Sequence, residues 1–117
     1  MKEVVYTDRA RQDLNELAAL QAVTDILERV AARSSDTVVA EWDRTTDPHG
    51  GPAFILRLSD WSGAASAVFA PRDLKPTNLL WARLYSLWGD LLQVRSNKQH
   101  EKVQAISGQI NGGHEVH

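Results

Sequence analysis

The segment from residue 78 to residue 95, NLLWARLYSLWGDLLQVR, constrains the fold more than any other part of the chain. Its apolar residues recur every three or four positions, which is the spacing of one face of an α-helix. They form two adjacent stripes, one of Leu80, Leu84, Leu87, Leu91 and Val94 and the other of Trp81, Tyr85, Trp88 and Leu92. Together the stripes cover about half of the helix circumference, whereas a surface helix normally needs an apolar arc of about 100°. The segment therefore predicts a helix with more apolar surface than one neighbouring layer needs.

This surplus can be covered in three ways. Both stripes can belong to the core, wedged between a sheet and another helix. A second copy can cover them, since two-fold dimers are the commonest assembly, or a different protein can do so. Exposed aromatic patches mark interaction sites, and Trp and Tyr are enriched in interface hot spots. We predict an interface with a second copy or another protein, formed by Trp81, Leu84, Tyr85, Trp88 and Leu92.

Upstream, the pattern predicts a short N-terminal strand at 2–6 and a long helix over 9–33, with Thr7 or Asp8 as its N-cap. The helix segment contains no Gly or Pro and is rich in good helix formers. Its apolar residues at 14–18 and at 23–30 do not share one straight stripe. Either the apolar face rotates around the helix or the helix bends near residues 20–24, while a helical hairpin would lack a turn-forming glycine.

Three further segments have strand chemistry, at 37–44, 53–59 and 64–70, and the loop TTDPHGGP separates the first two. In the first strand, alternation places Val38, Ala40 and Trp42 on one face. In the second strand it places Phe54, Leu56 and Leu58 on one face.

The hairpin between the last two strands admits two registers. A three-residue loop pairs Asp60 with Ala64 and places Val68 on the face of Leu56; a four-residue loop pairs Ser59 with Ala64 and brings Phe69 to the face of Phe54. Turn chemistry favours the first register, which we expect, and hydrophobic matching favours the second. A slip of one residue would exchange the two faces of the strand.

The last helix is expected to begin near Pro76, with Asp73 as its cap, and to continue as a polar extension to about residue 105. We therefore predict one α+β domain over 1–106 and a flexible tail over 107–117. The domain has two layers: a long N-terminal helix and a long C-terminal helix bracket a three-stranded antiparallel meander, to which the N-terminal strand can add.

The composition of the chain limits the kinds of partner and the cellular compartment that we expect. The net charge of −2 argues against nucleic acid, whose binding domains are usually basic. The chain has no cysteine, which excludes disulfides and thiolate chemistry and suits a reducing compartment. No apolar run approaches the roughly 18 residues of a membrane span, and residues 1–12 lack the apolar region of a signal peptide. We expect a cytoplasmic protein without a membrane anchor.

Candidate chemistry is sparse. Glu41, Asp43, Asp47 and His49 could supply metal ligands, but their spacing matches no known metal motif, and a solvated strand edge paired with Arg57 explains them as well. His114, Glu115 and His117 form a short tract at the chain end that predicts incidental metal binding at most. We predict no catalytic residue, no metal site and no cofactor.

The opening residues VVYTDRARQDLNEL resemble the start of ParE/RelE-type toxins, which begin with a short strand, a Tyr-Thr or Tyr-Ser turn and a helix of the A-x-x-D-L pattern. The resemblance implies a ribonuclease, or a protein acting on a nucleic-acid-associated target, but it transfers no functional residue to this chain. A ribonuclease of this kind would act through basic residues of the sheet, for which Arg57 and Arg72 are the candidates. The remainder departs from that family, whose members are usually basic and end on a sheet. Our leading hypothesis is therefore a non-enzymatic α+β interaction module that self-associates through its last helix.

Overall fold

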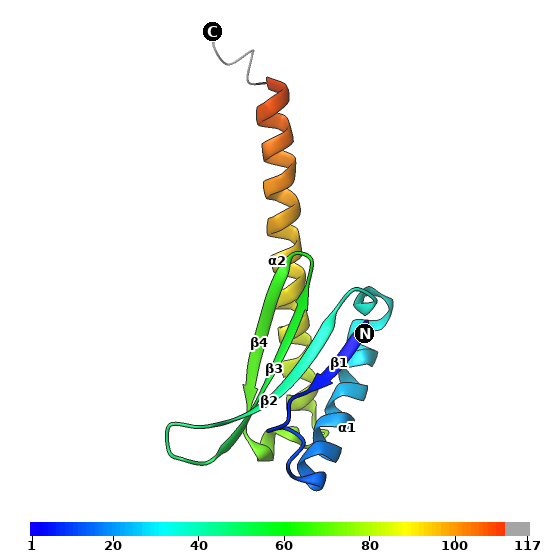
Figure 1. Cartoon of the computed structure of the whole chain (residues 1–117). Helices are drawn as coiled ribbons and strands as arrows, with labels where there is room; N and C mark the ends of the chain where they lie inside the picture. Colours follow the sequence, from blue (N-terminus) through cyan, green and yellow to red (C-terminus); the bar gives the residue numbers. More distant parts are fainter. Residues whose placement is uncertain (112–117) are drawn as a thin grey trace.

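The computed structural model describes the backbone of residues 1–111 and the side chains of residues 1–32 and 35–105. A four-stranded sheet, in the order β1-β2-β3-β4, is covered on one face by two helices (Figure 1). The elements in chain order are β1 (Glu3–Tyr6), α1 (Leu14–Ala31), the 3-10 helix η1 (Ala32–Ser35), β2 (Val39–Thr46), β3 (Pro52–Asp60), β4 (Gly63–Phe69), the 3-10 helix η2 (Pro71–Leu74) and α2 (Asn78–Asn111). The α+β class is confirmed.

The sheet differs from the prediction in having four strands and a mixed direction. The strands β2, β3 and β4 form the expected antiparallel meander, but β1 pairs with β2 in parallel, with Val4 opposite Ala40 and Tyr6 opposite Trp42. The expectation of a three-stranded antiparallel sheet was therefore wrong. The physical reason is that α1 carries the chain back along the sheet, so that β1 and β2 run in the same direction, as in a βαβ crossover.

The core lies between the helices and one face of this sheet. Ala40 and Trp42 of β2 are fully buried, as are Phe54, Leu56 and Leu58 of β3, so the inner faces predicted from alternation are confirmed. No described helix lies over the opposite face, where Val68 is 53% exposed. The large buried side chains of β2 and β3 therefore lie on the side of the sheet that the helices cover.

The β3–β4 hairpin adopts the register that hydrophobic matching favours. Ser59 pairs with Ala64 and Phe54 pairs with Phe69, so the register expected from turn chemistry was wrong. Asp60 also pairs with Gly63, which shortens the loop to the two residues Trp61 and Ser62. This register buries the Phe69 ring beside Trp42, at a centroid distance of 5.7 Å, whereas the alternative would have turned it to solvent.

The helix α1 is one continuous helix but is shorter than predicted. Its N-cap is Asp13, whose carboxylate accepts hydrogen bonds from the backbone N–H of Asn15 and Glu16, and residues 8–11 form a turn instead. Its buried stripe is confined to residues from Leu20 to Ala31, while Leu14 is 79% exposed. The first apolar group therefore lies outside the core, which explains why the two groups do not share a stripe.

The helix α2 begins at Asn78, where Thr77 accepts a hydrogen bond from the N–H of Leu80 through its hydroxyl. Asp73 instead accepts from the N–H of Ala70 at the start of η2. The helix continues to Asn111, so residues 107–111, which were assigned to the tail, are helical. Its C-terminal half extends well beyond the sheet, and the molecule measures 65 × 31 × 25 Å along its principal axes (Figure 1).

Candidate interaction surface on the last helix

The two apolar stripes of α2 differ in how far the domain buries them. Members of the first stripe are buried in the core, namely Leu80, Leu84, Leu87 and Leu91. The second stripe is divided, because Trp88 is buried and Trp81 is half-buried, whereas Tyr85 is 57% exposed and Leu92 is 41% exposed. Of the residues predicted for the interface, Leu84 and Trp88 therefore stabilise the domain itself, while Tyr85 and Leu92 face solvent.

The exposed part continues along the helix past the sheet. Val103 lies eleven positions after Leu92 and is 59% exposed. At about 3.6 residues per turn, Trp81, Tyr85, Leu92 and Val103 lie on one side of the helix. We call these four residues the α2 stripe. Leu79 is also exposed, at 64%, but it projects about 120° away from Tyr85 and does not belong to the stripe.

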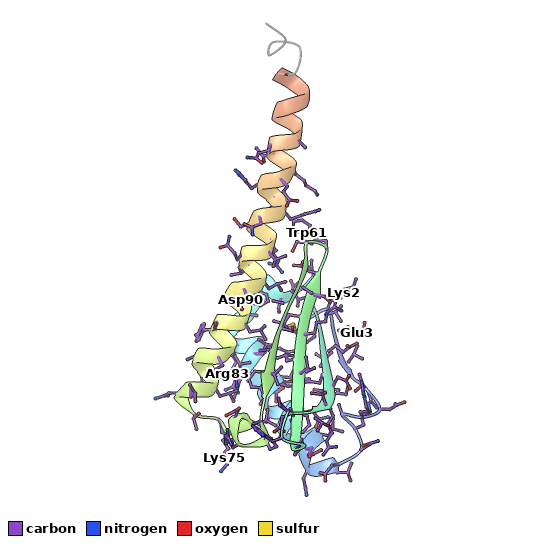
Figure 2. All side chains as sticks on the ribbon, turned by 90° about the vertical axis from the view of Figure 1, so that its left-hand side faces the viewer. Lys2, Glu3, Trp61, Lys75, Arg83 and Asp90 are labelled. Atoms are coloured by element: carbon purple, nitrogen blue, oxygen red, sulfur yellow. The ribbon has the colours of Figure 1, made fainter. Side chains whose placement is uncertain are left out.

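Arg83 fixes the first half of α2 to the sheet (Figure 2). Its guanidinium donates a hydrogen bond to the carbonyl of Val68 at 2.5 Å and lies 3.4 Å from a carboxylate oxygen of Asp73. The same guanidinium stacks over the ring of Phe69, 4.2 Å from the centroid. Because these contacts hold α2 from both β4 and η2, the rotation of the helix about its own axis is set, and with it the direction of the α2 stripe.

An ion pair fixes the helix again where it leaves the sheet. The carboxylate of Asp60, fully buried, accepts a hydrogen bond from Arg95 Nε at 2.5 Å and two more from the N–H and hydroxyl of Ser62. Burial alone would raise the pKa of Asp60, but the hydrogen bonds from Ser62 and Arg95 outweigh it, so the pKa lies below its ordinary value. The Arg95 guanidinium also lies 5.4 Å from the ring of Trp88.

The tip of the β3–β4 hairpin supports α2 further out, and Figure 2 places Trp61 there beside the helix. The ammonium of Lys102 lies 5.1 Å from the centroid of the Trp61 ring, a cation–π contact. On the same hairpin, Gly63 approaches α2 so closely that a Cβ atom would lie 2.9 Å from Val94 Cγ1. The hairpin therefore braces the helix from Val94 to Lys102.

The carboxylates considered as metal ligands are dispersed and occupied. Asp43 accepts a hydrogen bond from the Thr7 hydroxyl at 2.7 Å and forms an ion pair with Arg9 at 2.6 Å. The Thr7 hydrogen bond is the largest cause that lowers the pKa of Asp43. Asp47 accepts from the backbone N–H of His49 and Gly51 within its own loop.

Within the described residues, no group of three His, Asp or Glu side chains could hold a metal ion. Glu41 lies directly opposite Arg57 across the sheet. His114, Glu115 and His117 lie outside the described residues.

The arginines considered for a toxin-like activity are both exposed and lie on separate elements, Arg57 on β3 and Arg72 in η2. An open pocket of about 640 Å³ lies at the C-terminal end of β3. Its lining includes Lys2, Val39 and Trp61, and neither arginine contributes to it. The structure does not bring these candidate residues together in one site.

Sequence reasoning missed the outer contacts of α2. Val103 was not assigned to the apolar stripe because the residues around it after Arg95 are mostly polar. The spacing of Val103 from Leu92 nevertheless continues the helical repeat. The ion pair of Asp60 with Arg95 joins residues far apart in the chain, and no local pattern indicates it.

No protein-family model, no curated protein and no solved structure matches this chain. The resemblance to ParE/RelE-type toxins therefore rests on the opening residues alone. Among the described residues, no helix is both long enough and apolar enough to span a membrane.

Proposed function

We propose that this protein is a non-enzymatic interaction module, two copies of which associate through α2. The observation that carries the proposal is the α2 stripe, a line of aromatic and aliphatic side chains left partly or largely exposed on a helix that both ends of the sheet hold in place. A stripe on a fixed helix presents one preformed surface, so association requires little ordering.

The outer part of α2 supports the same proposal. Every side chain from Ser96 to Ala105 is exposed, and apart from the contact of Lys102 with Trp61 this part extends into solvent. In proteins most helical stability comes from tertiary packing of an apolar face, and residues 96–105 have little such packing within one copy. A partner helix lying along the stripe would supply this packing.

The test is the mass of the protein in solution, by light scattering after size exclusion and by sedimentation over a range of concentrations. We expect twice the 13.0 kDa of one chain for the wild type. Leu92→Glu should shift the mass towards one chain, because it places a charge at the centre of the stripe. Leu79→Glu is the matched control: it adds the same charge to another exposed leucine of α2, outside the stripe, and should leave the mass unchanged.

Two results would contradict the proposal. One is a wild type that keeps a mass of 13.0 kDa at the highest concentrations used. The other is an equal loss of association in both leucine variants, because the stripe would then have no special role. The circular dichroism spectra and melting temperatures of both variants check that each monomer remains folded.

A further inference from the structure

We infer that the two copies pair antiparallel, with Leu92 of each at the two-fold axis. This inference rests on the proposed self-association and adds the geometry of the partner. It follows from the positions of the side chains along α2.

The α2 stripe is symmetric about Leu92. Trp81 and Val103 lie eleven positions before and after it, and Tyr85 and Gln99 lie seven positions before and after it. An antiparallel two-fold axis at Leu92 therefore brings Trp81 of one copy to the partner's Val103 and Tyr85 to the partner's Gln99. An isologous interface contains each such contact twice.

The paired side chains are chemically complementary. Trp81 meets an aliphatic side chain, and the Tyr85 hydroxyl meets the amide of Gln99, which can both donate and accept a hydrogen bond. A parallel pair would instead place Gln99 against its own copy, and Tyr85 against its own. Antiparallel packing also brings opposite ends of the two helix dipoles together.

The length of the outer helix agrees with this arrangement. With the axis at Leu92, residues 96–105 of one copy lie along residues 79–88 of the other, so the part of α2 that extends beyond its own sheet covers the exposed stripe of the partner. Gly89 lies one turn before Leu92, and a Cβ atom built there would have no neighbour within 4 Å. This open space lets the helix axes approach, and it gives a role to a glycine that would cost about 1 kcal/mol relative to alanine in a helix interior.

Disulfide trapping tests the direction of the pair, because the chain has no cysteine and each introduced thiol is the only one. Tyr85→Cys and Gln99→Cys are oxidised separately and as an equal mixture. In the antiparallel pair, like positions lie fourteen residues apart along the axis, about 21 Å, whereas a disulfide needs Cα atoms within about 7 Å. We expect the gel band to shift from monomer to dimer in the mixture only. An equal mixture of Leu79→Cys and Gln99→Cys is the matched control and should stay monomeric.

The other outcomes separate the two proposals. If each variant forms a disulfide dimer alone and the mixture adds nothing, the pair is parallel and the inference is wrong, while self-association stands. If the wild type and both variants under reducing conditions have the mass of one chain, self-association itself fails, and the antiparallel pair fails with it. A dimeric mass without any disulfide at these positions would also overturn the axis at Leu92.

Discussion

Replacement of Thr24 by valine tests the polar contact that joins α1 to the sheet. The Thr24 hydroxyl donates to the carbonyl of Leu20 at 2.8 Å and accepts from the indole Nε1–H of Trp42 at 2.8 Å, and Trp42 is fully buried. Valine has the shape of threonine, so no cavity forms, but the indole N–H loses its acceptor inside the core. A buried donor without an acceptor costs about 1–3 kcal/mol. The hydroxyl of Tyr6, at 3.4 Å, adds little because that side chain is half-buried and can reach water.

We therefore expect Thr24→Val to lower the free energy of unfolding by about 1–3 kcal/mol. The assay is urea denaturation followed by far-UV circular dichroism at one fixed protein concentration, since self-association would make stability depend on concentration. The control is the same change in a Trp42→Phe background, which has no indole N–H to leave unpaired. There the change should cost less than about 0.5 kcal/mol, because removing both partners is nearly neutral. An equal loss in the two backgrounds would refute the reasoning.

Three further predictions concern the contacts that hold α2. Gly63→Ala should lower stability by about 1–3 kcal/mol in urea denaturation, because φ is +144° and the new Cβ meets Val94; adding Val94→Ala should restore only part of the loss. Leu84→Ala should cost about 2–5 kcal/mol and Leu79→Ala less than about 0.5 kcal/mol, since only the first side chain is buried; equal costs would contradict the assignment of the core. The lowered pKa of Asp60 means that its stabilisation is complete above the unfolded pKa of about 3.9 and is lost as the pH falls through the folded value, so acid titration of Asp60→Asn should show a shallower loss than that of the wild type.

The parts of the fold that follow from local periodicity could be read from the sequence. The inner faces of β2 and β3 and the helical nature of α2 depend on side-chain spacing within one element. Trp42 and Leu56, for example, needed only the alternation of their own strands to be placed in the core.

The parts that depend on distant residues could not be read in the same way. The start of α1 was misplaced because Thr7, Asp8 and Asp13 are all good caps, and tertiary contacts decide among them: the Thr7 hydroxyl donates to Asp43 on β2. The hairpin register was misjudged because turn chemistry is local, whereas burial of Phe69 depends on its contact with Trp42.

The exposure of the α2 stripe followed from the sequence only in part. Periodicity showed that α2 has more apolar surface than one layer covers, but it could not show which residues would be buried. Trp88 and Tyr85 have equivalent positions in the repeat and differ only in what the rest of the domain places over them. Trp88 is buried because it packs against the core, whereas the Tyr85 side chain remains exposed to solvent. The spacing of Val103 was available in the sequence, but its polar neighbours outweighed it.

The helical geometry of the outer part of α2 restricts how the chain can change in length. One residue inserted between Arg95 and Val103 would turn everything beyond it by about 100° and move it outward by about 1.5 Å. Tyr85 and Leu92, held by the domain, would keep their direction while Val103 turned out of line with them. An insertion of seven residues would restore the direction to within about 20°. The reach of the helix can therefore vary in near-heptad steps, whereas a single-residue insertion would change the direction in which the helix presents its apolar side.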